Sequence, residues 1–185
     1  LEIKQDEKIK SPDDHWNDKM RAEYRVKNDF KIKDEDLKAL RSIGITTAHI
    51  VPEKGIFKGK SDLVVLNDTY VSVAKNVAQV MSFKTGGWGD GYPHSLLGII
   101  AFMRQSLLDA EWFGKSMNIL EKYPDENEPI PLNPSLEALE EFRANRRPML
   151  FMTKEEHGAG DMGTKELLKK YLKDTPHMTI NDKFS

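Results

Sequence analysis

The clearest indication of the fold class lies in residues 40–51, which read Leu-Arg-Ser-Ile-Gly-Ile-Thr-Thr-Ala-His-Ile-Val. The first four of them end a helix that we predict over residues 33–43, because three acidic side chains stand in its first turn, where the helix dipole favours negative charge. Gly44 follows at the position where a glycine commonly ends a helix. The β-branched run after it, stopped by Pro52, predicts a buried strand with two apolar faces, as parallel sheets require. Helix, glycine and strand in this order are typical of an α/β fold.

Further along the chain this pattern returns after an interruption. Short apolar runs at 62–67 and 70–83 predict a small β insertion. The next segment, 95–123, predicts a long helix that is apolar around most of its circumference and therefore buried on several sides. A helix over 135–145 and a strand over 148–152 then repeat the helix–strand unit. The sequence therefore predicts two or three βα units with a small β insertion.

Composition excludes several classes of protein. The chain has 185 residues and a net charge of -2, which gives no electrostatic footprint for nucleic acid. It contains no cysteine, which excludes a disulfide scaffold and a zinc-thiolate site. No apolar run approaches the roughly 20 residues that a membrane-spanning helix needs. The length is also short of the ~250 residues typical of a complete (β/α)8 barrel.

Charge and hydropathy patterning predict three regions. Residues 1–14 have few apolar side chains and no clear periodicity, so we expect a flexible or docking arm. Residues 15–153 form the expected α/β domain. Residues 154–185 contain an amphipathic helix and a tail of unknown role. The chain opens on Leu1 rather than Met, so a processed, trimmed or fragmentary start is one expectation.

The most distinctive local pattern is Gly-Gly-Trp-Gly-Asp-Gly at residues 86–91. Gly86, Gly87, Gly89 and Gly91 permit positive φ and can bring backbone N–H groups to an anion or another ligand, which makes them candidate ligand-loop residues. The stretch lacks the Gly-Lys-Ser/Thr ending of a phosphate loop. A plain turn between a strand and the next helix is the alternative that we favour.

Four side chains outside this loop are candidates for chemistry. His49 stands near the end of the first predicted strand, where parallel α/β folds place catalytic groups. His94 precedes the long helix, and His157 shares a glycine-rich stretch with Asp161, a pairing suited to acid–base work. Arg104 on the long helix is suited to binding a carboxylate. For His49, His157 and Arg104 we favour the structural alternatives: a partly buried histidine, a loop before a helix, and a tie to a neighbouring loop.

The remaining sequence motifs indicate no further chemistry. The five histidines show no His-x-His or His-x3-His spacing, so the chain has no metal ligand set by motif. The chain also has no Gly-x-Ser-x-Gly elbow, so serine hydrolase chemistry has no support.

Six short motifs nevertheless occur in an informative order. They are His-Trp-Asn at 15–17, Arg-Ala-Glu-Tyr at 21–24, Leu-Arg-Ser-Ile-Gly-Ile-Thr-Thr at 40–47, Gly-Ile-Phe-Lys-Gly at 55–59, Gly-Tyr-Pro-His-Ser-Leu-Leu-Gly at 91–98 and Arg-Gln-Ser-Leu-Leu-Asp-Ala at 104–110. Together with the helix–strand unit at 134–152, they make residues 15 to about 153 resemble an internal stretch of the amidohydrolase superfamily, in its imidazolonepropionase-like bacterial branch.

This resemblance implies a partial (β/α)-barrel-like arrangement and a metal-dependent hydrolase that acts on cyclic amide or peptide-like C–N bonds. In such enzymes Zn or another divalent metal activates a water molecule. The family's first His-x-His would lie before Leu1, and its later metal-binding histidines and catalytic aspartate lie beyond the matched stretch. No position in this chain takes over those roles by motif. The resemblance suggests a periplasmic or secreted bacterial protein, with a cytoplasmic one as the alternative.

Two hypotheses about function follow. In the first, the chain is a portion or subunit of an amidohydrolase-like enzyme, inactive alone and completed by the remainder of the barrel or by another protein chain. In the second, it is a non-catalytic binding or assembly protein derived from the same fold. A third arrangement, a small enzyme using His49, His94 and His157 together, has only its residue types in support.

Overall fold

Two separate four-stranded sheets organise the chain, one of order β1-β2-β4-β5 and the other of order β3-β6-β7-β8. The computed structural model describes residues 2–3, 11–84, 91–125, 128–153 and 177–181. Its strands are β1 (Glu2–Ile3), β2 (Thr47–Pro52), β3 (Phe57–Lys60), β4 (Asp62–Val65), β5 (Val71–Ala74), β6 (Gln79–Ser82), β7 (Met149–Thr153) and β8 (His177–Asn181). Its helices within these ranges are the 3-10 turn η1 (Val26–Asp29), α1 (Asp34–Ser42), α2 (Leu96–Lys122) and α3 (Pro134–Ala144).

The first sheet is mainly antiparallel. Strands β2, β4 and β5 pair as an antiparallel set, and β1 joins the outer side of β2 in parallel. Its small apolar cluster is formed by Val26, Ile50 and Val64, with Tyr24 and Phe30 packed against it. Strand β2 is exposed at its first residue and becomes buried only over its last three, so only this end reaches the interior.

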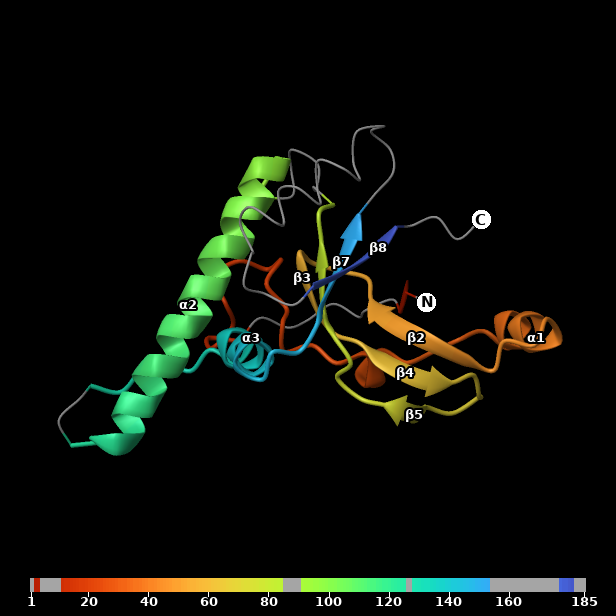
Figure 1. Cartoon of the computed structure of the whole chain (residues 1–185), viewed down its shortest axis with the longest axis horizontal. Helices are drawn as coiled ribbons and strands as arrows, with labels where there is room; N and C mark the ends of the chain where they lie inside the picture. The colour runs from red at the N-terminus through yellow and green to blue at the C-terminus, as the bar shows by residue number, and fades with distance from the viewer. Residues whose placement is uncertain (1, 4–10, 85–90, 126–127, 154–176, 182–185) are drawn as a thin grey trace.

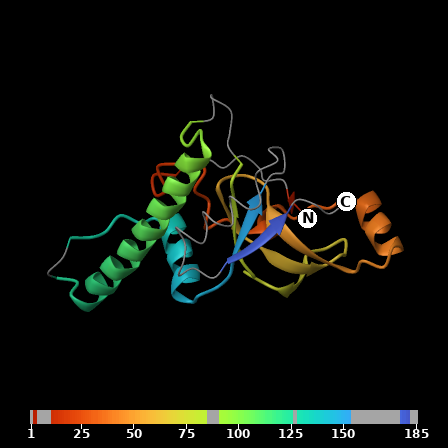
Figure 2. The ribbon, with the colours of Figure 1, turned by 45° about the horizontal axis from the view of Figure 1, so that its top comes forward.

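The second sheet holds the parallel strands. Strands β6, β7 and β8 run parallel, while β3 pairs antiparallel with β6 at the edge. Helices α2 and α3 lie in the connection between β6 and β7 and cover one side of this sheet (Figures 1 and 2). The main core between them is formed by Met20, Ala22, Ile56, Phe57, Met81, Ile99, Phe102, Met103, Ala110, Phe113, Leu136, Ala138, Leu139, Met149 and Phe151.

The expected partial (β/α)-barrel is wrong. Helix α1 leads into an antiparallel sheet and stands at the opposite end of the molecule from α2 (Figure 1). The short connection between β4 and β5 allows antiparallel pairing but is too short for the crossover that parallel strands require, and β6 then joins the other sheet. The fold is therefore mixed α/β, with two small sheets in place of repeated βα units.

The helices themselves agree with the sequence. Helix α1 starts one residue inside the predicted 33–43, and the segments predicted at 95–123 and 135–145 form α2 and α3. Side-chain caps explain two of the starts: Ser95 accepts a hydrogen bond from Gly98 N, and Asn133 accepts one from Leu136 N. None of the helices in the described ranges has the length and apolar character to cross a membrane. The helix predicted within 154–185 lies outside the described residues.

An N-terminal segment joins the two sheets. The backbone of residues 19–25 runs along β3, with Arg21 N donating to Phe57 O and Lys60 N donating to Tyr24 O. Gly59 makes this approach possible, because its φ is +122° and an added Cβ would lie 2.6 Å from Tyr24 O.

Candidate functional site

The carboxyl ends of the parallel strands are the best placed candidate site. Open sheets with parallel strands bind ligands outside this edge. Ser82 ends β6 and is in register with Met152 near the end of β7, so the two strand ends lie side by side. Lys58 on β3 reaches the same place, with its Nζ 3.4 Å from Met152 Sδ. The site thus brings residues from three strands to one edge.

Lys58 and Ser82 are almost completely buried at this edge, at 4% and 3% exposure. The Ser82 hydroxyl accepts a hydrogen bond from Lys84 N at 3.1 Å, which anchors the chain where it leaves the strand. An ammonium and a hydroxyl are groups that bind carboxylate or carbonyl oxygens. Hydrolysis needs in addition a general base or an activated water, and an ammonium that holds the substrate cannot also accept a proton.

His49, the candidate on the first predicted strand, lies in the other sheet. It stands on β2, and its Nε2 lies 2.8 Å from Ser61 Oγ. Ser61 is fully buried, and its hydroxyl also donates to Ala78 O and accepts from Ala78 N. Burial lowers the pKa of His49. This bonding gives His49 and Ser61 a structural role in which they link the strands, although a histidine–serine contact is also found in nucleophilic sites.

The remaining candidates are scattered. His94 is exposed in the loop before α2, and Arg104 is exposed on α2 itself. Gly91 has a φ of +70°, and its carbonyl accepts a hydrogen bond from Lys19 Nζ at 2.9 Å. His157, Gly86, Gly87 and Gly89 lie outside the described residues. The catalytic and ligand-binding roles predicted for these seven positions and for His49 therefore stay predictions.

Sequence reasoning missed how the loop before α2 is held. Asn17 Nδ2 donates to Tyr92 O at 3.0 Å, so a residue near the N-terminus fixes the start of the long helix. Four aromatic rings pack together in the same place, those of His15, Trp16, Tyr92 and Phe102. The ring centroid of Phe102 lies 6.2 Å from that of His15 and 6.1 Å from that of Trp16, and the Trp16 and Tyr92 centroids lie 6.5 Å apart. Burial lowers the pKa of His15. The only sequence signal for this contact is the adjacent pair His15-Trp16, and the sequence does not indicate which residues these two rings contact.

Sequence reasoning also missed the buried lysines of β3. Gly55 and Gly59 bracket Ile56-Phe57-Lys58, a pattern that predicts a tight loop or bulge. It forms a strand, with a bulge between Phe57 and Gly59, and all four of its residues are buried. Lys60 is 4% exposed and donates from Nζ to Glu141 Oε2 at 2.7 Å. The alternation of lysine with Phe57 and Gly59 was the available signal for a strand.

The chain shares its fold with a solved amidohydrolase. The crystal structure of an amidohydrolase from Thermotoga maritima MSB8 superposes with a TM-score of 0.67 over 88% of this chain, at 13% sequence identity. This chain spans 43% of that protein's length. No protein-family model matches the sequence. No curated protein matches it either. The similarity supports an amidohydrolase-like fold and no particular branch of the superfamily.

The amidohydrolase likeness raises the question of a metal. Within the described ranges, no three His, Asp or Glu side chains gather in a group that could hold a metal ion. Lys58 and Ser82, the polar side chains that the structure describes at the carboxyl edge, are not metal ligands of the usual kind. The described side chains of this edge therefore do not fit a catalytic metal, and no chemical step is assigned to one.

Proposed function

We propose that this chain carries part of an amidohydrolase-like hydrolase that cleaves C–N bonds of cyclic amides or peptide-like substrates. The observation that carries the proposal is the match of 88% of the chain to the fold of a solved amidohydrolase. The order of the motifs between residues 15 and 152 supports the imidazolonepropionase-like branch.

In this proposal the edge formed by β6, β7 and β3 contributes to binding. The buried Lys58 ammonium holds a carboxylate or a polarised carbonyl of the substrate, and Ser82 orients it. The general base, or the group that activates water, is a residue other than these two, because the Lys58 ammonium that holds the substrate cannot also accept a proton. Further residues of a larger enzyme or another protein chain supply these groups.

A chimaera tests this proposal. This chain replaces the matched 43% of the Thermotoga maritima amidohydrolase, and hydrolysis of a panel of cyclic amides and dipeptides is measured beside the parent enzyme. The isolated chain is expected to turn over no substrate, while the chimaera hydrolyses at least one. Lys58→Met in the chimaera should raise KM about tenfold or more, since it removes a charged hydrogen bond to the substrate. A folded chimaera without activity, or turnover by the isolated chain, would contradict the proposal.

A non-catalytic binding or assembly role is the second candidate. It is favoured by a long helix that exposes large apolar side chains on its outer face. The chimaera separates the two candidates, because an assembly protein would restore folding and association without hydrolysis.

A further inference from the structure

Helix α2 carries a stripe of exposed apolar side chains that the proposed hydrolytic function does not use. Leu97, Leu108, Trp112 and Ile119 are 69%, 51%, 61% and 52% exposed. Their separations of 11, 4 and 7 residues are close to whole numbers of helical turns, so the four side chains share one face of the helix. We call these four residues the α2 stripe. A helix of 27 residues is about 40 Å long, and the stripe follows most of it.

The opposite face of α2 is already occupied. Ile99, Phe102, Met103, Ala110 and Phe113 pack into the main core. At 3.6 residues per turn, these positions lie roughly half a turn away from the α2 stripe. The stripe therefore faces away from the core, and in Figures 1 and 2 α2 forms the flank of the molecule.

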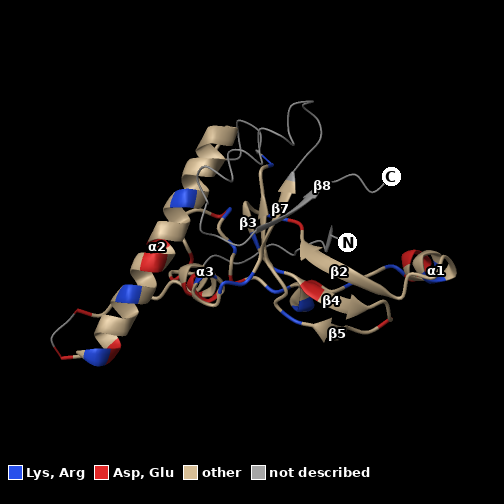
Figure 3. Ribbon diagram, viewed as in Figure 1, with Lys and Arg blue, Asp and Glu red and all other residues tan. Residues whose placement is uncertain are grey.

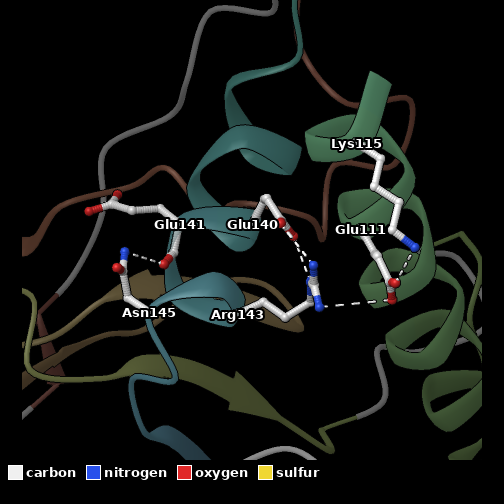
Figure 4. Close-up of polar contacts among 6 residues, drawn as sticks. All are labelled: Glu111, Lys115, Glu140, Glu141, Arg143 and Asn145. Atoms are coloured by element: carbon white, nitrogen blue, oxygen red, sulfur yellow. Dashed lines mark hydrogen bonds and ion pairs between the residues drawn. The ribbon is translucent and has the colours of Figure 1, made fainter. Parts of the chain in front are cut away.

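A polar network fixes the side of α2 next to α3 (Figure 4). Arg143 on α3 makes two hydrogen bonds to Glu140 and lies 3.9 Å from Glu111 Oε2 on α2. Glu111 also accepts a hydrogen bond from Lys115 Nζ at 2.7 Å. Helix α2 is thus held by the core and by α3, and it can present the stripe to a partner without rearranging.

We propose that the α2 stripe binds the α2 stripe of a second copy of this chain, in an antiparallel pair with a two-fold axis close to Leu108. Two-fold dimers are the commonest soluble oligomers, and they pair a patch with itself. With the axis at Leu108, Leu97 faces Ile119 of the partner subunit, and Leu108 faces its own counterpart. Leu97, Leu108 and Ile119 then each meet an apolar residue of the partner subunit, and Trp112 meets Arg104 of the partner subunit.

The positions of the charged residues favour a pair with its axis at Leu108 over pairs with the axis shifted by one helical turn. Charged residues are few along α2 and are separated by uncharged stretches (Figure 3). Lys115 lies 18 residues, or five turns, from Leu97 on the face of the stripe, where it pairs with Glu111 and, with the axis at Leu108, meets Ala101 of the partner subunit. Arg104 is the charged residue that stands among the stripe residues of the N-terminal half. With the axis at Leu108, its guanidinium faces the ring of the partner subunit's Trp112 and the carboxylate of the partner subunit's Glu111, which is favourable on both counts. Moving the axis one turn toward the N-terminus would place Arg104 against itself, and moving it one turn toward the C-terminus would place Arg104 opposite the apolar Leu120 of the partner subunit.

The first test measures the mass of the full chain in solution as a function of concentration, by light scattering and analytical ultracentrifugation. The wild-type chain is expected to dimerise. Leu108→Glu should raise the dimer dissociation constant about a hundredfold, because it places two carboxylates at the axis. Val73→Glu is the matched control, since Val73 is 58% exposed on β5 and lies outside the stripe. Circular dichroism checks that both variants stay folded. A wild-type chain that remains monomeric, or a dimer that tolerates Leu108→Glu, would overturn the proposal.

The second test checks the register with single cysteines, which the sequence permits because it contains none of its own. Leu108→Cys should form a disulfide across the axis under mild oxidation. Leu97→Cys and Ile119→Cys should cross-link when the two variants are mixed, and neither should cross-link when alone. Val73→Cys should not cross-link. Equal cross-linking at Val73 and Leu108, or self-pairing at Leu97, would overturn the antiparallel register.

Discussion

At the residue scale, the ion pair between Lys60 and Glu141 is strongly asymmetric in its burial. The lysine side chain is 4% exposed and the glutamate side chain 43%, with 2.7 Å between Nζ and Oε2. Lys60 Nζ also lies 5.4 Å from the centre of the Phe142 ring. The lysine therefore depends on the glutamate for its charge partner, whereas water can solvate the glutamate if the lysine is removed.

Removing the glutamate should therefore lower the free energy of unfolding more than removing the lysine. Glu141→Ala leaves a buried ammonium without its carboxylate, and we expect a loss of about 2–3 kcal/mol in the free energy of unfolding. Lys60→Met removes the buried charge and keeps the volume, so a change within about 1 kcal/mol is expected. Urea denaturation measures both, with the exposed Glu137→Ala on the same helix as the control. A Lys60→Met variant less stable than Glu141→Ala would refute this account.

The candidate site residues show why sequence alone stopped short of a site. His49 was singled out by its position near a strand end, which is sound for a parallel sheet, but β2 pairs antiparallel with β4. Its bond to Ser61 depends on strands brought together by the fold, and no spacing in the sequence encodes it. Lys58 and Ser82 were not predicted for the same reason, since their neighbour Met152 stands far along the chain.

At the element scale, the close contact between β3 and the N-terminal segment can be tested by substituting two glycines, one at the contact and one away from it. Gly59 and Gly44 both have positive φ, +122° and +86°. A Cβ on Gly59 would lie 2.6 Å from Tyr24 O, whereas a Cβ on Gly44 would meet nothing within 4 Å. Gly59→Ala should cost about 3 kcal/mol or more, and Gly44→Ala only about 1 kcal/mol for its backbone conformation. Thermal or urea unfolding of the two variants measures the difference, and equal costs would show that β3 and Tyr24 do not approach so closely.

Helices were predictable from the sequence because their signals are local. The start of α2 carries its own cap in Ser95, and α3 has Asn133 and Pro134 at its start. The strands gave weaker signals. Whether β2 pairs in parallel or antiparallel is decided by which strand lies beside it, and the buried lysines in β3 disguise a core strand as a polar loop. The error about the barrel came from this step, since the pattern of helix, glycine and strand does not specify strand direction.

At the scale of the whole molecule, four titratable groups make stability depend on pH in the same direction. Burial lowers the pKa of His15 and of His49 below the usual 6.5. The hydrogen bond from Lys60 lowers the pKa of Glu141 below the usual 4.5, and the hydrogen bond from Lys115 does the same for Glu111. In each case the unfolded chain binds a proton more tightly than the folded chain. Each group therefore contributes stability that is present above its unfolded pKa and is lost as the pH falls through its folded pKa.

The free energy of unfolding should accordingly fall in two stages on acidification, first below about pH 6.5 from the histidines and then below about pH 4.5 from the carboxylates. In the first stage protonation of His15 also removes an acceptor, because Asn17 N donates to its Nδ1 at 3.2 Å. Urea denaturation at a series of pH values measures the profile. His15→Gln and His49→Gln together should flatten the first stage and leave the second, while Glu141→Gln should weaken the second and leave the first. If stability still falls in the first stage when both histidines are replaced, groups other than His15 and His49 cause that loss.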